Sequence, residues 1–374
     1  MSRAARHSNP SARPEVLRLA DPASILTSVP YLVGFDPQES LVLMALHGPR
    51  KRVGLTLRVD LGDGTSRADR VIAAEAAGHV VRELADAQPA AALAVVYTNE
   101  GPAGGNGTRA GSGAHEALVP ELTARLSAAG VELVSVLRVS GGRWWADDPC
   151  ADISCCPPGG QPVPQPRTGA ASSSATLAAA TFVADGRAVL PDRAALEHLL
   201  DPDPRADHEA VRDALLEGDD GERGSRIDAR VTLRRLRRAA REVTAGRQLS
   251  DAALGRLAAG LRSVAVRDQV LSLVVDPDAA GIREVLIHLV RRLPPPDDAH
   301  AAAMLAWVAH AEGSGALANV AVDRALAGVP DHSLARLVDA ALRGGLPPKR
   351  LHEVAHLLRS GRGATPHQGR AAAS

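Results

Sequence analysis

The sequence is poor in aromatic residues, lysine and cysteine, and each shortage narrows the class of protein it can encode. Aromatic residues make up 2% of the 374 residues, so the core must be built mainly from leucine, valine and alanine. Lysine occurs only at Lys51 and Lys349, and arginine therefore carries nearly all of the positive charge. Three cysteines are too few for a disulfide framework in a chain of this length, which favours a reducing compartment.

The chain also lacks a net charge and a long apolar run. Its 43 basic and 43 acidic side chains give a formal net charge of zero, so no overall field attracts nucleic acid or an anionic membrane. No apolar run approaches the roughly 18 residues that a membrane helix needs. The N-terminus has arginines but no apolar segment behind them, which is not the pattern of a secretion signal. We therefore expect a cytoplasmic protein with no membrane partner, and nucleic acid is not a favoured partner.

The first half of the chain alternates between strand and helix patterns, which predicts an α/β domain. Asp21-Pro22 is a helix start, with Asp as the N-cap and Pro at the first helical position, and Gly34 ends that helix. A turn at residues 47–49 is expected to join two strands in an antiparallel hairpin. The alternation that follows predicts parallel crossovers within a mixed sheet. Strands are expected at 15–19, 40–46, 53–61, 93–98 and 131–139, and further helices at 71–84 and 118–129.

Strand patterns then stop, and helical patterns continue almost to the end of the chain. We predict that every strand of the main sheet lies within residues 15–200 and that none lies beyond residue 205. A stretch rich in proline and aspartate at 201–205 marks the predicted boundary. The predicted organisation is a disordered leader at 1–14, an α/β domain at 15–200, an all-helical domain at 205–360 and a disordered tail at 361–374.

The segment at residues 143–164 concentrates residues that can carry chemistry. It holds all three cysteines of the chain, Cys150, Cys155 and Cys156, and it begins with Arg143-Trp144-Trp145. Thiolates in this arrangement are candidate ligands for zinc or an iron–sulfur centre, although the segment offers no histidine to complete a set. The alternative is a proline-punctuated loop whose cysteines pack against the tryptophans. We expect an ordered loop that lies against the sheet, with Arg143, Trp144 and Trp145 as possible ligand contacts.

A second candidate metal site is the pentapeptide His352-Glu353-Val354-Ala355-His356. On a helix the two histidines share one face, which suits zinc, and the glutamate could serve as a general base. A catalytic zinc needs a third protein ligand, and only His367 follows, in the predicted tail. The preferred interpretation is two half-exposed histidines beside an apolar stripe, so we predict that His352 and His356 hold no catalytic zinc.

Two further patterns have structural interpretations. Five arginines follow a helical spacing and could bind phosphate, but the acidic stretch at 217–222 can neutralise them. Residues 301–330 predict a helical hairpin that is loosely similar to one tetratricopeptide unit and is more simply an ordinary pair of packed helices. The arginines are Arg230, Arg234, Arg237, Arg238 and Arg241.

Several separate segments together resemble one protein family. They are residues 17–26 and 29–42, Arg58-Val-Asp-Leu, Leu137 to Trp145, the cysteines with Pro157, and Leu190-Pro-Asp-Arg. In these segments the chain is similar to the actinobacterial family called domain of unknown function 4192. The Gly-rich stretch at 101–113 departs from that pattern. The resemblance implies no activity, because the family is named for lacking an assigned one.

No nucleophile elbow, P-loop or complete metal set can be read from the sequence, so its function is left open between two classes. The first is a non-catalytic interaction or regulatory protein that binds another protein through its helical domain. The second is a metal-binding protein or enzyme with zinc or iron at the cysteine loop or, less favoured, a zinc hydrolase that uses His352, Glu353 and His356.

Overall fold

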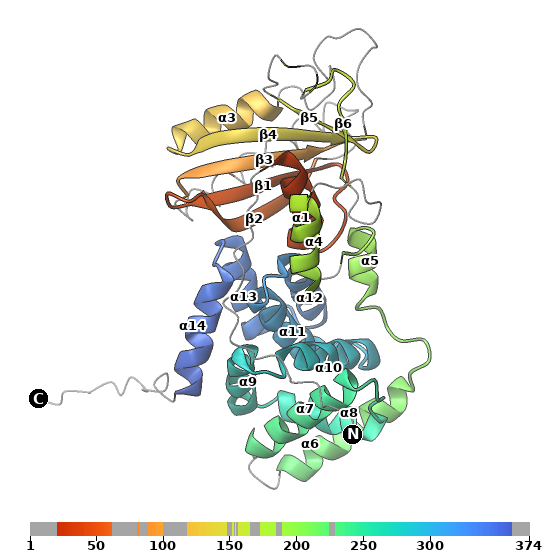
Figure 1. Cartoon of the computed structure of the whole chain (residues 1–374). Coiled ribbons are helices and arrows are strands. Elements are labelled where there is room, and N and C mark those ends of the chain that lie inside the picture. The colour runs from red at the N-terminus through yellow and green to blue at the C-terminus, as the bar shows by residue number, and fades with distance from the viewer. Residues whose placement is uncertain are drawn as a thin grey trace, which may run out of the picture.

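The chain folds into a sheet region followed by a helical region (Figure 1). The computed structural model describes residues 21–61, 81, 89–99, 118–147, 152, 154, 156–164, 173–184, 189–223 and 229–360. Within these residues every strand lies between residues 40 and 162, and only helices, turns and irregular segments follow. This confirms the predicted order of an α/β region with a mixed sheet and a helical region. The predicted leader, the strand at 15–19, the tail and almost all of the predicted helix at 71–84 lie outside the described residues.

The sheet contains six strands in the order β2-β1-β3-β4-β5-β6. The predicted hairpin is present, because β1 and β2 pair antiparallel. The strands β3 and β4 form the parallel pair that the intervening helix requires, while β4, β5 and β6 pair antiparallel in sequence. The bounds are Ser40–His47 (β1), Arg52–Asp60 (β2), Ala91–Tyr97 (β3), Glu132–Ser140 (β4), Arg143–Ala146 (β5) and Gln161–Pro162 (β6).

Helices cover both faces of this sheet because the central strands are apolar on both sides. Helix α3 (Leu118–Ala128) places Leu122 and Leu126 against one face, beside Leu43 of β1. Helix α1 (Pro22–Val33) covers the other face, where Val42 belongs to the same hydrophobic cluster as residues of α1. The alternation of side chains along β1 therefore divides its residues between two cores.

Helix α1 begins and ends where the sequence predicts. The Asp21 carboxylate accepts a hydrogen bond from the Ser24 backbone N–H at 2.8 Å, and Pro22 occupies the first turn. Gly34 ends the helix with φ 97°, a left-handed conformation that glycine adopts without a Cβ penalty. Helix α4 (Ser173–Ala184) packs beside α1, so the face of the sheet that α1 covers is followed by a second helical layer.

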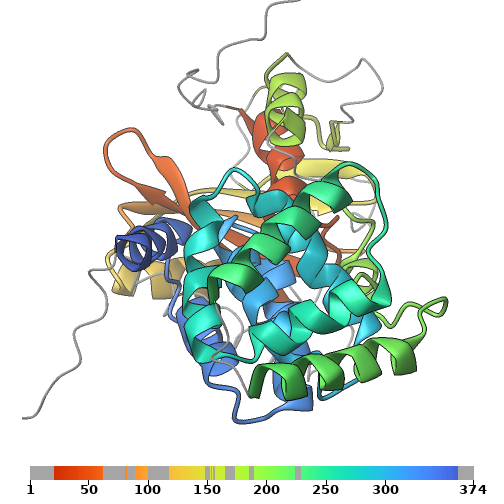
Figure 2. The same cartoon turned by 90° about the horizontal axis from the view of Figure 1, so that it is seen from below.

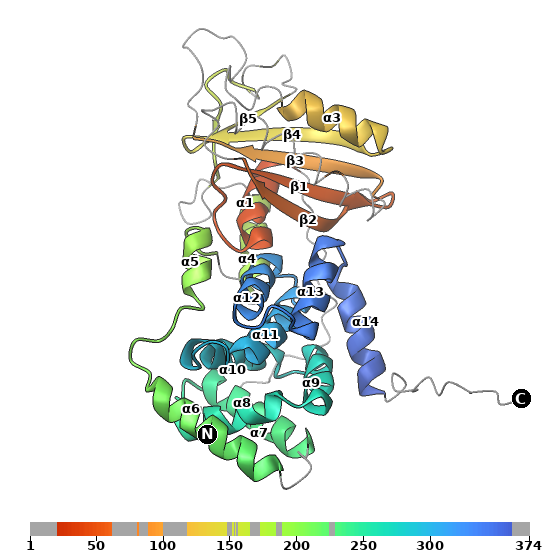
Figure 3. The same ribbon diagram turned by 180° about the vertical axis from the view of Figure 1, so that it is seen from behind.

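The helical region is a set of helices, several of which follow one another after only a few residues, whereas a longer connection joins α5 to α6 (Figure 3). Helix α11 is its centre: all of its residues except His300 are buried, as expected for a helix that is apolar on every side. The bounds are Arg193–His198 (α5), His208–Arg223 (α6), Ala229–Thr244 (α7), Asp251–Leu261 (α8), Val264–Leu271 (α9), Ser272–Val275 (the 3-10 helix η1), Ala279–Arg292 (α10), Ala299–Ala311 (α11), Gly315–Gly328 (α12), Ser333–Arg343 (α13) and Pro348–Arg359 (α14).

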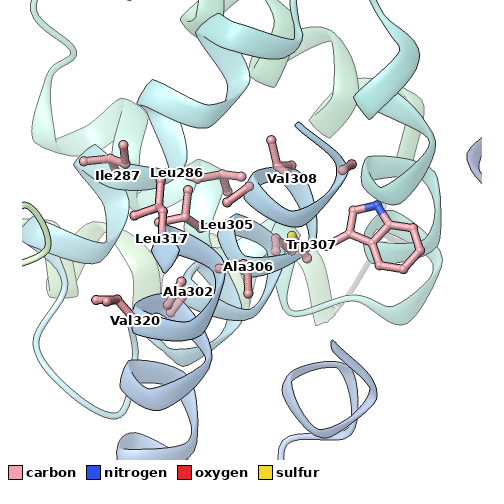
Figure 4. Packing of buried hydrophobic residues seen from close by; sticks show 14 of the residues in the cluster. Leu286, Ile287, Ala302, Leu305, Ala306, Trp307, Val308, Leu317 and Val320 are labelled. Atoms are coloured by element: carbon pink, nitrogen blue, oxygen red, sulfur yellow. The ribbon is translucent and has the colours of Figure 1, made fainter. Parts of the chain in front are cut away.

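Figure 4 shows the packing around α11, where Leu286, Leu305 and Leu317 meet at the centre of the helical core. Trp307 is 5% exposed, and its indole N–H donates to the Leu271 carbonyl at 3.1 Å. Helices α11 and α12 form the predicted hairpin at 301–330. They pack as an ordinary helix pair that is surrounded by neighbouring helices on several sides.

One hydrophobic cluster runs from the α1-covered face of the sheet into the helical region. It contains Val42 of β1, Val29 of α1 and Leu305 of α11. The division of the chain into domains at residues 201–205 stays a prediction, and any such division is crossed by this continuous core. None of the helices in the described residues combines the length and the apolar character needed to span a lipid bilayer.

Candidate functional site

The predicted loop at 143–164 begins as a strand, which corrects the sequence-based interpretation. Arg143–Ala146 forms β5 and continues the sheet beside β4, and Gln161–Pro162 forms β6 beside β5. A two-residue turn at Gly141-Gly142, with φ values of 53° and 73°, reverses the chain between β4 and β5. Because the two glycines interrupt the strand pattern, the sequence suggested that the strand ends there. We call the segment formed by β5, β6 and the described residues between them the edge ribbon.

Arg143 and Trp145 donate hydrogen bonds to backbone carbonyls of residues 158–160, just before β6. The Arg143 guanidinium donates from Nε to the Gly159 carbonyl at 2.6 Å and from Nη2 to the Gly160 carbonyl at 2.8 Å. The Trp145 indole N–H donates to the Pro158 carbonyl at 3.0 Å. Its ring lies over Gly160, where a Cβ would come within 2.4 Å of the indole. Both side chains thus stabilise the ribbon, and Arg143 uses two of its donors inside it.

Trp144 and Cys156 also make contacts that stabilise the edge ribbon. Trp144 is half-buried and packs against the hydrophobic cluster on the α1-covered face. Cys156 is half-buried, and its backbone N–H donates to the Asp152 carbonyl at 2.8 Å. Cys150 and Cys155 lie outside the described residues, so the predicted metal set of three cysteines is represented by Cys156 alone. The described residues of the ribbon continue the sheet at its edge, and the expectation of an ordered loop over all of residues 143–164 stays a prediction.

The two histidines of the pentapeptide lie on helix α14, as predicted. His352 is half-exposed and His356 is exposed, while Leu351 and Ala355 face the core. Nowhere in the described part of the chain do three histidine, cysteine, aspartate or glutamate side chains gather in a way that could hold a metal ion. The metal-binding alternative therefore gains no support from the described residues.

The arginine stripe lies on helix α7, and two of its members pair with acids outside the predicted stretch. Arg237 contacts Asp276 at 2.9 Å, and Arg241 contacts Asp278 at 3.1 Å. These aspartates lie between η1 and α10, and α10 packs against α7. Burial by itself would raise the pKa of Asp276. Hydrogen bonds from the Asp278 N–H and from Arg237 outweigh burial and hold this pKa below its ordinary value. The sequence predicted neutralisation by residues 217–222, because it could not show which turn packs beside α7.

A group of polar side chains at one end of the sheet was missed by the sequence-based search. Ser40 of β1 lies directly between Asp60 of β2 and Tyr97 of β3, so the three side chains share the α1-covered face. Arg58 points along this face, pairs with Asp60 and stacks its guanidinium 5.0 Å from the centre of the Phe35 ring. Burial, reinforced by the charge of Asp36, raises the pKa of the Tyr97 phenol, which keeps it protonated.

These contacts connect segments that are far apart in sequence. Phe35 forms a bridge with Leu190, and the Asp36 N–H donates to the Leu190 carbonyl at 3.0 Å. Arg193 lies 4.0 Å from Asp60. Three of the segments that carry the family resemblance, 29–42, 58–61 and 190–193, therefore meet at this end of the sheet. Their shared role in this structure is to join α1, β2 and the chain that leads into α5.

A second polar group lies at the start of α11 and was also missed. The Asp298 side chain is fully buried and pairs with Arg324 of α12 at 2.6 Å. His332 caps α13: its Nδ1 accepts the Ala335 N–H at 3.3 Å, and its Nε2 lies 3.1 Å from His300 Nδ1. Since Nδ1 of His332 accepts, its Nε2 must carry the proton and donate to His300. Both rings are therefore neutral, and these bonds connect α11 to α12 and α13.

The outer face of helix α14 carries exposed apolar side chains. Val354 is 41% exposed and Leu357 is 53% exposed, and Leu357 borders a shallow depression with Glu353, His356 and Ser360. Figure 1 and Figure 3 both show α14 on the outside of the helical region. The opposite side of the helix is anchored by buried Leu351 and Ala355. Glu353 and His356 of the pentapeptide thus border an exposed apolar surface.

Comparison with known proteins identifies the family of the chain. A family model described as Domain of unknown function (DUF4192) matches residues 22–349, which is most of the sequence. No curated protein and no solved structure matches the chain. The matched range includes the whole described sheet, the edge ribbon and the helical region as far as the start of α14. This chain therefore belongs to the family of the domain of unknown function DUF4192.

Proposed function

We propose that this chain is a non-catalytic interaction protein whose helical region binds another protein through the outer face of α14. The observation that carries the proposal is the exposure of Val354 and Leu357 on a helix that is otherwise firmly held. Large apolar side chains exposed next to each other are typical of interaction surfaces. Charged residues such as Glu353 and Arg350 lie beside them and form an ion pair of 2.9 Å, which resembles a polar rim around an apolar centre.

The attachment of α14 also favours this role. Arg359 reaches the Ser272 carbonyl at 3.4 Å and Asp276 at 3.6 Å, so the end of α14 is joined to η1. A helix fixed in this way loses little conformational freedom when a partner binds. Arg237, Arg241 and Arg143 already have acidic or carbonyl partners, which favours a protein partner over nucleic acid. We place this interaction in the cytoplasm, in agreement with the small number of cysteines.

The proposal is tested by photo-crosslinking in the cells that naturally produce the chain. A photoreactive amino acid at position 356, beside Leu357, should yield one adduct of defined mass. The same amino acid at position 216 of α6, where Leu216 is also exposed, is the control and should not yield that adduct. Val354→Asp should remove the adduct at position 356 without changing the circular dichroism of the protein. Equal patterns from positions 356 and 216, or an adduct that survives Val354→Asp, would contradict the proposed surface.

A further inference from the structure

Neither helix α4 nor its neighbour α1 contains a charged residue. Helix α4 has the sequence SSATLAAATFVA and α1 has the sequence PASILTSVPYLV. The side of α4 that faces the protein is made of Ala175, Ala178 and Ala179, which are buried. Figure 2 shows α4 beside α1, at one side of the molecule and outside the main body of helices. The two helices together therefore form an uncharged projection.

The outward side of α4 exposes several apolar side chains. Leu177 is 52% exposed and Val183 is 59% exposed, and exposed Ala180 lies between them. Their spacing of three residues places them on one face of the helix. Exposed Thr176 lies beside them, so the outward side of α4 is uncharged and carries one hydroxyl. The stripe formed by Leu177, Ala180 and Val183 thus has the composition of the centre of an interface.

The absence of charge indicates which partner this stripe fits. In a two-fold symmetric contact each surface meets a copy of itself, so any charge near the axis faces a like charge. The uncharged stripe of α4 avoids that repulsion, whereas on α6 the exposed Leu216 is followed directly by Glu217. Alanine at the middle of the stripe also lets two helices approach closely, since interaxial distances depend on the side chains at the contact.

The aromatic contact between the two helices keeps this surface in a fixed shape. Tyr31 of α1 and Phe182 of α4 stack with their ring centres 5.3 Å apart and their planes at 7°. Gly34, directly after α1, fixes the end of that helix. We propose that the chain forms a two-fold symmetric dimer in which the α4 stripe, Leu177, Ala180 and Val183, packs against the same stripe of a second copy.

Sedimentation equilibrium tests the dimer. The natural chain should sediment with twice its 38.8 kDa mass, and Leu177→Glu should sediment as a single chain because it places two like charges at the axis. Leu216→Glu is the matched control, since it introduces the same charge at another exposed leucine, and it should leave the dimer intact. Circular dichroism shows whether each variant is folded. A single-chain mass for the natural protein, or a dimer that survives Leu177→Glu, would overturn the proposal.

A second variant keeps the proposal testable if Leu177→Glu does not fold. Ala180→Cys should form a covalent dimer under mild oxidation, because the two-fold axis brings position 180 near its copy. The natural chain, with its own three cysteines, and Leu216→Cys are the controls and should form far less. No excess of covalent dimer from Ala180→Cys would overturn the symmetric contact. Flotation of a single-chain natural protein with neutral lipid vesicles would also overturn it, in favour of a lipid surface. Val354→Asp should leave the mass unchanged, so this test is independent of the proposed α14 surface.

Discussion

The edge ribbon and the helical region both contain tryptophan and glycine at tight contacts, but they use them differently. In the helical region Trp307 is almost completely buried at the centre of a large cluster. In the ribbon Trp144 and Trp145 are half-buried, and Trp145 covers a single turn. The comparison indicates that the helical region is held by extensive packing, whereas the ribbon is held by its pairing with β4 and by a few side-chain hydrogen bonds. Local structure of this kind opens at lower free energy than a core does.

The largest expected difference between the two regions is in the free energy of unfolding that is lost when a tryptophan is removed. Trp307→Ala should lower the free energy of unfolding by about 3–5 kcal/mol, because it leaves a cavity in the helical core. Trp144→Ala should lower it by about 1–2 kcal/mol, because less of that side chain is buried. Urea unfolding measured by circular dichroism gives both values. Trp307→Phe is the control that keeps most of the buried volume and loses the indole N–H and its hydrogen bond to Leu271. Equal losses for Trp307→Ala and Trp144→Ala would remove the proposed contrast between the two regions.

The second comparison concerns glycines at close contacts. A Cβ on Gly255 of α8 would lie 2.5 Å from the Ala214 Cβ and 2.6 Å from the Ala214 carbonyl carbon, so Gly255→Ala must separate α6 from α8. We expect a loss of about 1–3 kcal/mol in urea unfolding, as for other overpacked contacts.

In Gly160→Ala the new Cβ would meet the Trp145 ring, and the φ of 69° adds strain. The half-exposed Trp145 ring can move outward, so we expect a change in tryptophan fluorescence and only a small change in the unfolding midpoint. Gly159→Ala, where no atom lies within 4 Å of the new Cβ, serves as the control for both variants. If Gly160→Ala destabilised the whole chain as much as Gly255→Ala, the ribbon would not be a locally held unit.

The smallest expected effect is a dependence of stability on pH that arises from the histidine pair of the helical region. Burial, together with the charges of His332, Arg262 and Arg267, lowers the pKa of His300 to about 4. Burial and Arg267 also lower the pKa of His332. Histidine in the unfolded chain titrates near 6.5. The pair therefore contributes its full stability above pH 6.5, and this contribution is lost as the pH falls from about 6.5 toward 4.

The matched variant is His332→Asn, because asparagine can still accept the Ala335 N–H as an N-cap but does not titrate. Urea unfolding between pH 5 and pH 8 should show a smaller loss of stability on acidification for His332→Asn than for the natural chain. The difference should be on the order of 1 kcal/mol at pH 5, because a histidine that stays neutral in the folded state loses about 1.4 kcal/mol of stability for each pH unit below its unfolded pKa. Identical pH profiles for the two proteins would show that the histidine pair stays neutral in both states or does not connect α11 to α13.

Local patterns in the sequence were sufficient for much of the fold. The start of α1 at Asp21-Pro22 and its end at Gly34 follow from capping, which depends only on neighbouring residues. The hairpin of β1 and β2 and the change from strands to helices follow from side-chain periodicity. The strand β5 was missed because its four residues are too short to show a period, and its pairing with β4 supplies the stability that its own sequence does not.

The sequence by itself determined the order of the elements, the family of the chain and the position of the histidines on α14, because each depends on residues close together in the chain. Only the tertiary structure decided which groups meet. Arg143 donates to carbonyls 16 and 17 residues away, and Arg237 pairs with Asp276, 39 residues away. His300 and His332, 32 residues apart, become neighbours because α11 and α13 pack together. Such partners are fixed by how helices and strands pack across the whole core, and no local pattern contains that information.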